Sequence, residues 1–142
     1  AIFEIDRFAA FKLRFGHSMA DEVLWAFGSF LANMLPEDCI LARLDGDRFA
    51  VLMPDCDGAI ALAFAQDVLA TFACLAADTR RKGAGCVETR LTASAGIASF
   101  AGSPDMVMAH AERALVVARA MGGRRAEIRE DRSRQGSQRT GT

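Results

Sequence analysis

The sequence has no excess of either charge. Its 142 residues contain 17 Lys and Arg against 18 Asp and Glu, which leaves a formal net charge of -1 at pH 7. A balance this even excludes the broad basic field through which many proteins bind nucleic acids or acidic membrane surfaces. We therefore expect no nucleic acid as a partner, and binding sites have to be sought in local groups of residues.

Clustered cysteines are also missing. Cys39, Cys56, Cys74 and Cys86 are far apart, form no C-x-x-C pair and have no histidine at ligand spacing. This arrangement excludes the common structural zinc motifs, which need pairs of ligands close together in the sequence. We interpret the four cysteines as reduced residues of the core of a cytosolic protein.

The sequence shows no long apolar run and no targeting segment. Asp or Gly interrupts its apolar stretches well before the roughly 20 residues that are needed to span a bilayer, and no signal peptide is visible. We expect a cytoplasmic domain without membrane contact of its own, whether or not its parent protein is attached to a membrane. Because an apolar stretch begins directly after Ala1, we also expect that an N-terminal part of the domain is missing.

What is present is the composition of one globular domain with alternating strands and helices. Hydrophobic residues make up 51% of the chain and charged residues 25%, a balance typical of a domain with a sizeable core. The order of the elements predicts an α/β (α+β) fold, in which helices cover the faces of a mixed sheet. The periodicity predicts strands over residues 1–7, 39–44, 48–53, 87–100 and 125–129, helices over residues 8–15, 18–35, 60–79 and 103–121, and a polar tail or linker over residues 130–142.

Local signals indicate where the helices begin and end. Gly16 ends the first helix, Ser18 caps the second, and Ser103 with Pro104 begins the last. Small residues in segment 93–96 would let another element approach the fourth strand closely. The apolar stripes of the three long helices predict their buried faces, which are Val23, Phe27, Phe30 and Met34; Ile60, Phe64, Val68, Phe72 and Leu75; and Val107, Ala111, Ala114, Ala118 and Met121.

Acidic residues on the strands suggest where a site lies. Glu4 and Asp6 leave the first strand on one side, opposite its apolar residues. Asp45-Gly46, between two strand-like runs, is the strongest short signal for a hairpin. We expect this hairpin to project at the rim of the sheet near Glu4, with the carboxylate of Asp47 on the same face.

Three segments, in this order, carry a resemblance to a known family. They are residues 3–8 (F-E-I-D-R-F), residues 15–17 (F-G-H) followed by Asp21, and residues 43–49 (R-L-D-G-D-R-F), with support from residues 91–98 and 114–119. The set resembles the GGDEF domain, the bacterial module that makes cyclic di-GMP from GTP. The resemblance covers residues 1–129 and implies a mixed, largely antiparallel central sheet flanked by helices, of the nucleotide-cyclase or palm-like type.

The resemblance also implies a metal site. In the family, an acid on the first strand and the acid after the two signature glycines hold magnesium against the triphosphate of GTP. By resemblance these are Glu4 and Asp47, with the main-chain carbonyl of Ile5 beside them. Oxygen ligands suit Mg²⁺, which is a hard ion. Glu4 is one methylene longer than the usual Asp. The alternative is that Glu4 and Asp47 are solvated residues on an exposed strand face.

Two departures from the family bear on activity. Arg48 stands where the family has a second acid, used for metal binding or for activating the ribose hydroxyl, and Ala9 replaces the lysine on the phosphate side. We expect no catalytic residue at Arg48, whose charge should repel Mg²⁺ or neutralise Asp47 or Glu4 instead. Loss of a general base alone costs about 10² to 10⁴ in rate. Alternatively, Arg48 is a strand residue with its head in water, which still leaves the acid absent.

The positions that would contact the nucleotide are altered as well. The resemblance places Lys12 and Asp21 where the family reads guanine, and Asp45 and Gly46 at the signature glycines. Lys12 has donors only and cannot reproduce the paired donor and acceptor of the usual asparagine, and Asp45 puts an anion beside the nucleotide. Arg119, near the end of the last helix, would meet a phosphate. Alternatively, Asp21 and Arg119 are ordinary charged residues that suit the helix dipole.

Expected roles can also be given for His17, for Trp25 and for the positions of the family's inhibitory site. His17, beside Gly16, is expected to make a structural hydrogen bond. Trp25 falls outside the apolar stripe of its helix and is either a contact residue or a partly buried packing residue. Pro36 and Cys39 occupy the places of the family's R-x-x-D inhibitory site, so feedback binding of cyclic di-GMP is not expected there.

These features together predict a degenerate GGDEF domain of a cyclic di-GMP signalling protein. It would be a regulatory module that binds GTP or acts structurally, without cyclase activity, and magnesium would bind only if the carboxylate pair still holds it. One alternative is an active diguanylate cyclase, in which two GTP-loaded copies form a homodimer. Another is a dimerisation scaffold that binds no nucleotide. An EAL-type phosphodiesterase domain is the expected partner in the same parent chain.

Overall fold

The computed structural model describes residues 1–82, 91–99 and 102–130, except for the side chains of residues 77–82. The predicted helices 8–15 and 18–35 form one element, α1, which is broken at Gly16 (φ 87°, ψ 171°). Because Gly16 itself makes the break, Ser18 lies inside the second segment of α1 and does not cap it. The elements in chain order are β1 (Ile2–Ile5), α1 (Phe8–Met34), β2 (Ile40–Asp45), β3 (Arg48–Leu52), α2 (Gly58–Lys82), β4 (Ala93–Ser99), α3 (Pro104–Ala120) and β5 (Ala126–Glu130).

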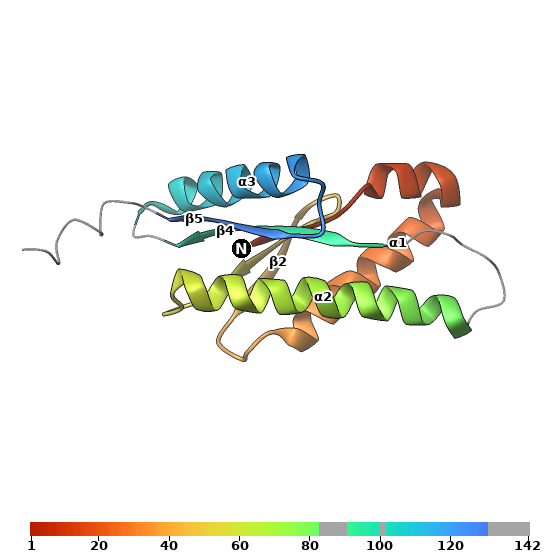
Figure 1. Cartoon of the computed structure of the whole chain (residues 1–142), viewed down its shortest axis with the longest axis horizontal. Helices are drawn as coiled ribbons and strands as arrows, with labels where there is room; N and C mark the ends of the chain where they lie inside the picture. The colour runs from red at the N-terminus through yellow and green to blue at the C-terminus, as the bar shows by residue number, and fades with distance from the viewer. Residues whose placement is uncertain (83–90, 100–101, 131–142) are drawn as a thin grey trace, which may run out of the picture.

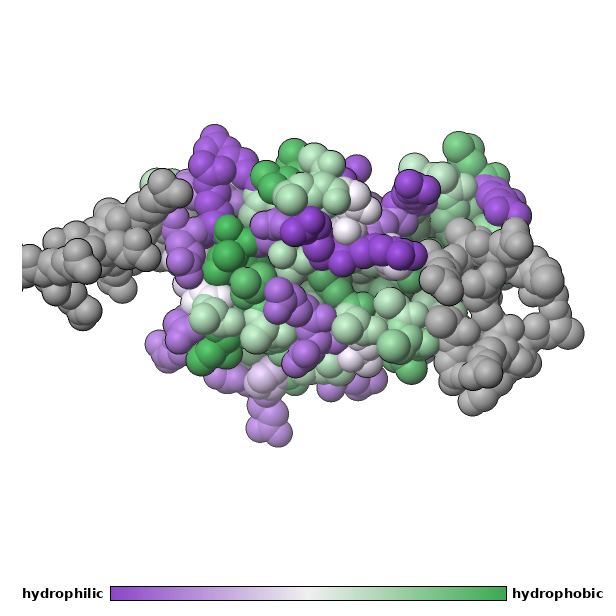
Figure 2. Space-filling view, viewed as in Figure 1, coloured by the Kyte–Doolittle hydropathy of each residue, from purple (hydrophilic) through white to green (hydrophobic). Residues whose placement is uncertain are grey.

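The five strands form one sheet in the order β2-β3-β1-β4-β5. β1, in the centre, is antiparallel to β3 and β4, and β2 is antiparallel to β3, whereas β5 runs parallel to β4. The predicted mixed, largely antiparallel sheet is therefore confirmed. Helices α1 and α2 cover one face of the sheet and α3 covers the other (Figure 1). On the side of the molecule shown in Figure 2, hydrophilic and hydrophobic residues are interspersed over the surface.

β1 alternates between the two layers as its sequence pattern predicts. Phe3 and Ile5 are fully buried in the main core with α1 and α2, whereas Ile2 lies in a smaller cluster with residues of α3. Glu4, on the same side as Ile2, is only 8% exposed. The alternative that Glu4 is a solvated residue on an exposed strand face is therefore wrong, because α3 lies over this face.

Gly96 in β4 allows α3 to lie directly on the sheet. A Cβ atom at this position would overlap with the main chain of α3, so the prediction that segment 93–96 admits a close neighbour is confirmed. The predicted start of α3 is also confirmed, since the side chain of Ser103 caps the helix and Pro104 lies in its first turn. β4 begins later than predicted, at Ala93, while residues 87–90 and the tail from residue 131 lie outside the described part of the chain.

The buried faces of the helices differ from the predicted stripes at three large residues. Ile60 and Leu75 of α2 are 61% and 51% exposed, and Met121, just after α3, is 57% exposed. The buried faces contain many alanines, which let a helix lie close to the sheet but contribute little to a hydrophobic pattern. The buried hydrophobic residues are Phe8, Phe11, Ala20, Leu24, Phe27 and Leu31 in α1; Ala61, Ala65, Val68, Leu69 and Phe72 in α2; and Ala111, Ala114, Leu115 and Ala118 in α3.

The described cysteines are free thiols that differ in exposure. Cys39 and Cys56 are half-buried beside the main core, but Cys74 is exposed on α2. The interpretation as a core residue is therefore wrong for Cys74, because it lies on the outward face of its helix. Cys86 lies outside the described residues.

One helix segment, Gly58–Ala76 of α2, is long and apolar enough by length and composition to cross a bilayer, with a mean hydropathy of 1.8. Asp67 interrupts this segment as predicted, but the mean hydropathy stays high because the residues around Asp67 are apolar. Val68 and Phe72 of this segment pack in the core of the domain.

Candidate functional site

The β2–β3 hairpin carries the candidate site at its turn. Gly46 has a positive φ of 47°, a conformation that glycine adopts at no steric cost. Arg43 braces the turn, because its Nε and Nη2 donate to the Gly46 carbonyl oxygen at 3.0 and 2.8 Å. A register shift between Arg43 and Asp45 ends the regular pairing of the strands. The predicted hairpin is confirmed, and its turn has a defined shape.

The register of β1 and β3 brings Glu4 to this turn, because Glu4 lies opposite Arg48. From the other side, α3 contributes Arg119, whose Nη1 lies 3.1 Å from Glu4 Oε1. Asp47, in the turn, is close enough for its charge to act on Glu4. The structure thus brings together the two predicted metal ligands and the cation that was expected to meet a phosphate.

The carboxyl groups of Glu4 and Asp47 both have raised pKa values. Burial raises the pKa of Glu4, and the nearby charge of Asp47 raises it further, while Arg119 and Arg48 act in the opposite direction. Burial also raises the pKa of Asp47, against a main-chain hydrogen bond and the charges of the same two arginines. The charged form of each carboxyl group is therefore disfavoured in spite of the two guanidinium groups.

Arg48 is directed to other acidic residues. Its Nε and Nη2 donate to the two carboxylate oxygens of Asp45 at 2.9 and 3.4 Å, and its Nη1 lies 3.6 Å from Glu112 of α3. The hydrogen bond with Asp45 is the main cause that raises the pKa of Arg48. Arg48 is therefore paired directly with Asp45 and not with Asp47 or Glu4, although its charge still acts to lower the pKa of both. The alternative of a free head group in water is not seen either, because the guanidinium group of Arg48 pairs with Asp45 and Glu112, while its side chain stays 30% exposed.

The donors at this site fit a hard divalent cation. Carboxylate and carbonyl oxygens are the ligands that Mg²⁺ prefers, and they are offered by Glu4, Asp47 and the main chain of Ile5 at the end of β1. The raised pKa values of the two carboxyl groups indicate that a further positive charge would be favourable there. Within the described ranges, no group of three or more His, Cys, Asp or Glu side chains could hold a metal. Main-chain or ligand oxygens would therefore have to complete the shell, and Arg119 competes for Glu4.

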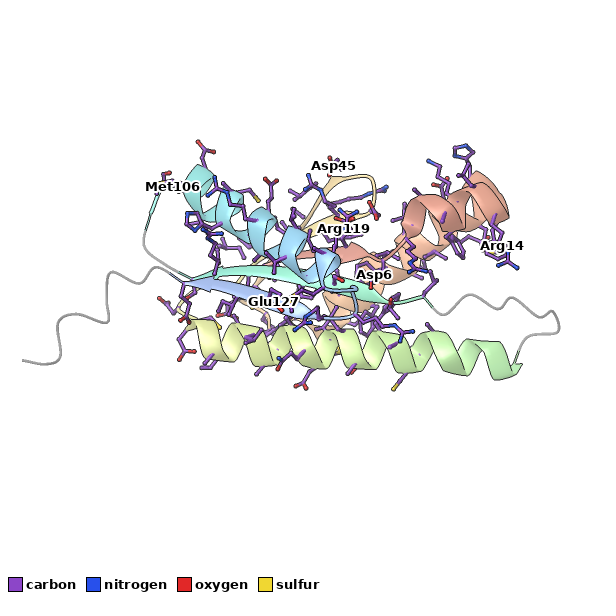
Figure 3. All side chains as sticks on the ribbon, turned by 45° about the horizontal axis from the view of Figure 1, so that its top comes forward. Asp6, Arg14, Asp45, Met106, Arg119 and Glu127 are labelled. Carbon is purple, nitrogen blue, oxygen red and sulfur yellow. The ribbon has the colours of Figure 1, made fainter. Side chains whose placement is uncertain are left out.

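Asp6 is a residue of the site whose role sequence reasoning missed. Its carboxylate accepts hydrogen bonds from Thr92 Oγ1 at 2.7 Å, Ser94 Oγ at 2.6 Å and the main-chain N–H of Arg124 at 3.0 Å. These contacts fasten the end of β1 to β4 and to the turn after α3. Figure 3 shows Asp6 and Arg119 at the same end of α3, so Asp6 holds the first strand in place relative to Arg119. The only signal in the sequence was that Asp6 shares a strand face with Glu4.

A groove of about 1120 Å³ lies between α1 and the hairpin. Asp21 and Trp25 of α1 and Arg43 and Phe49 of the hairpin are among its lining residues. Lys12, the other predicted guanine-reading residue, is exposed on the first segment of α1 and does not line the groove. Trp25 is 76% exposed, so the alternative of a partly buried packing residue is wrong.

The remaining positions singled out in the sequence lie away from these contacts. His17 is exposed, and no hydrogen bond from its side chain to another described residue is seen, so the structural hydrogen bond expected for it is not observed. Pro36 and Cys39, at the places of the family's inhibitory site, lie in the short connection before β2.

Comparison with known sequences agrees with this arrangement. Residues 1–125 match the family model described as diguanylate cyclase, GGDEF domain. The chain is 36% identical over 134 residues to diguanylate cyclase TpbB of Pseudomonas aeruginosa, an alignment that covers 89% of this chain and 30% of that protein. It is also 41% identical over 54 residues to the probable diguanylate cyclase DgcE of Escherichia coli, covering 38% of this chain and 5% of that protein. The chain thus spans only a minor part of the length of these relatives.

Solved structures show the same fold. The GGDEF domain of TpbB (YfiN) from Pseudomonas aeruginosa has a TM-score of 0.77 and 26% identity, covering 92% of this chain and 80% of that chain. The active GGEEF domain of a diguanylate cyclase from Vibrio cholerae has a TM-score of 0.76 and 20% identity, covering 89% of this chain and 79% of that chain. With the family model matching almost the whole described part and TpbB similar over the same length, the chain belongs to the GGDEF family of diguanylate cyclase domains.

Proposed function

We propose that this chain is a GGDEF domain of a cyclic di-GMP signalling protein, in which GTP is a regulatory ligand and is not turned over. The observation that carries the proposal is Arg48, which occupies the position of the second signature acid and is held by Asp45 and Glu112. A guanidinium group stays protonated in proteins and has no acceptor. It cannot take a proton from a ribose hydroxyl or serve as a metal ligand.

The expected loss of activity is large. Loss of a general base alone costs about 10² to 10⁴ in rate, and the positive charge of Arg48 in its place adds to this. Ala9, at the position of the phosphate-side lysine, removes a further cation from the triphosphate. We therefore expect no measurable cyclic di-GMP synthesis, although part of the binding site is retained.

The residues that remain for GTP are few and are of different kinds. Asp21 would accept hydrogen bonds from guanine, and Arg119 would contact a phosphate. Glu4, Asp47 and the Ile5 carbonyl would hold magnesium, which supplies positive charge to the triphosphate when it is bound. Because Arg119 already offsets part of the charge of Glu4, we expect Asp21 and Arg119 to contribute more to GTP affinity than the metal does.

An active cyclase is the second candidate, and two observations favour it. The relative TpbB, 36% identical, is named a diguanylate cyclase, and the carboxylates of Glu4 and Asp47 are brought together here as a metal site requires. Such activity would need two GTP-loaded copies facing each other in a homodimer.

The regulatory role suits a cytoplasmic domain that signals the binding of GTP to a neighbouring domain. We propose an EAL-type phosphodiesterase domain of the same parent chain as that neighbour. A structural neighbour from M. capsulatus, 21% identical, is described as an EAL/GGDEF domain protein, which supports the pairing by likeness of fold only.

Two measurements test the proposal. Isothermal titration with GTP, in Mg²⁺ or in EDTA, measures binding, and chromatography after incubation of concentrated protein with GTP and Mg²⁺ detects cyclic di-GMP. Binding without product supports a regulatory domain. Product that disappears in Asp47→Ala would show an active cyclase, and absence of both binding and product would indicate a dimerisation scaffold.

A further inference from the structure

Trp25 is the only tryptophan of the chain, and 76% of its surface is exposed. It follows Asp21 by one helical turn, so the two side chains lie on the same face of α1. Both line the groove between α1 and the β2–β3 hairpin. An indole in water presents a large aromatic surface, and covering that surface with a planar ligand is favourable.

Small residues next to Trp25 keep the groove open. Gly28 and Ser29 follow Trp25 on the same helix face and line the groove without filling it. Gly28 also allows the hairpin to come close, because a Cβ atom there would lie 3.0 Å from Cε1 of Phe49. The groove is therefore a shallow, open slot beside Trp25, with the helix on one side and the hairpin on the other.

The hairpin connects this slot to the carboxylate site. Arg43 lines the groove and also donates two hydrogen bonds to the carbonyl oxygen of Gly46, the residue before Asp47. A ligand in the groove thus lies beside the turn that carries Asp47. The groove offers an aromatic surface for a base, and the hairpin turn beside it leads to the carboxylates and to Arg119, which would contact a phosphate.

We propose that Trp25 is a base-stacking residue, on which the guanine of GTP lies in the groove with its edge directed to Asp21. An ionised carboxylate only accepts hydrogen bonds. Guanine offers two adjacent donors, N1–H and the N2 amino group, which one carboxylate accepts together. Adenine has a ring acceptor at the equivalent position and would turn a lone pair toward Asp21. Trp25 therefore supplies affinity for any base, whereas Asp21 supplies the preference for guanine.

This inference rests on the proposed binding of GTP and adds the residue that contacts the base. Because the chain has no other tryptophan, its intrinsic tryptophan fluorescence reports on the groove alone. The test is a fluorescence titration of the full chain with GTP and with ATP, together with calorimetry on the wild type, Trp25→Ala, Trp25→Phe and Asp21→Asn. Ile60→Ala is the matched control, since it truncates a large side chain that is 61% exposed and lies outside the groove.

We expect GTP to quench the fluorescence of Trp25 with saturation and to do so at lower concentration than ATP. Trp25→Ala should weaken GTP binding roughly 5- to 150-fold, the range for loss of one stacked base. Trp25→Phe should keep most of the affinity, Ile60→Ala should leave it unchanged, and Asp21→Asn should reduce the preference for GTP over ATP.

Two results would overturn the role of Trp25 and leave GTP regulation in place. One is equal GTP affinity of the wild type and Trp25→Ala by calorimetry, and the other is calorimetric binding without any change in fluorescence. Equal affinity for GTP and ATP in the wild type would refute the selection by Asp21. Absence of GTP binding in calorimetry would overturn the proposed function and the inference together.

Discussion

Arg119→Met is expected to destabilise the domain at neutral pH and to have little effect in mild acid. In the folded domain Arg119 lies 3.1 Å from Glu4, and its charge lowers the pKa of both Glu4 and Asp47. Without this cation, burial acts unopposed on Glu4 and Asp47, and the charge of Asp47 adds to it at Glu4. The pKa values of the two carboxyl groups, already raised, should therefore rise further.

Two limits bound the size of the effect. Removing one partner of a buried ion pair costs about 3–5 kcal/mol, whereas an exposed pair contributes about 0.2–1 kcal/mol. The side chain of Glu4 is 11% exposed and that of Arg119 is 57% exposed, so this pair lies between the two cases. We expect the free energy of unfolding to fall by about 1–2 kcal/mol at neutral pH, which is roughly 3–8 °C in Tm for a domain of this size.

The direction of the pH dependence follows from the raised pKa values. A carboxyl group whose pKa is higher in the folded than in the unfolded chain binds its proton more readily when folded. Its contribution to stability is full below the unfolded pKa of about 4, and it is lost as pH rises through the folded pKa. Each additional unit of pKa in the variant deepens this loss by about 1.4 kcal/mol. The difference between the variant and the wild type should therefore grow as the pH rises above about 4.

The assay is urea unfolding followed by circular dichroism at several pH values between about 4 and 8. Arg113→Met is the control, because Arg113 is exposed on the same helix and is not paired with the carboxylate cluster. A loss of stability that is the same at every pH, or that the control reproduces, would refute the electrostatic account of Arg119.

Three further outcomes are expected. Asp6→Ala should lower the free energy of unfolding, measured by urea unfolding, by about 1–3 kcal/mol or more, because the buried hydroxyl of Ser94 loses its acceptor. A smaller loss would show that water replaces the carboxylate. Gly96→Ala should cost about 1–3 kcal/mol, or prevent folding, because its Cβ meets the main chain of α3, and an unchanged Tm would contradict the close packing. In calorimetry, Asp21→Ala and Arg119→Ala should each weaken GTP binding roughly 10- to 100-fold through loss of a charge-assisted contact. Removing the metal with EDTA should weaken binding less. If EDTA abolishes binding while both variants bind normally, the metal contributes most of the affinity for GTP.

Local signals in the sequence were sufficient for the order of the elements. The Asp45-Gly46 turn, the glycine break at Gly16 and the Ser103-Pro104 start of α3 each depend on residues that are adjacent in the chain. The alternation in β1 likewise predicted that Glu4 and Phe3 face opposite layers. The part that failed concerns the outward-facing large residues of the helices, because alanines form much of the buried surface and leave the apolar stripe ambiguous.

The contacts of the site could not be predicted in this way, since they join distant segments. Asp6 binds residues that are 86 to 118 positions away in the sequence. No rule based on sequence spacing predicts such a contact. The burial of Glu4 depends on the placement of α3 over its strand face. The exposure of Trp25 depends on small residues that leave a groove where an apolar contact would otherwise cover the indole.

Asp45 and Arg48 show why substitutions in a signature have to be considered together. Considered singly, Asp45 places an anion beside the nucleotide and Arg48 places a cation beside the metal ligands. In the structure they form a two-point pair, with Nε and Nη2 of Arg48 on the two oxygens of Asp45, so each offsets much of the charge of the other. Burial keeps the pKa values of Glu4 and Asp47 raised, although the charge of Arg48 still acts to lower both. The acid that would accept a proton is nevertheless gone. Under the proposed function, the pair leaves Glu4 and Asp47 for a cation but supplies no proton acceptor, so we expect nucleotide binding to persist without turnover.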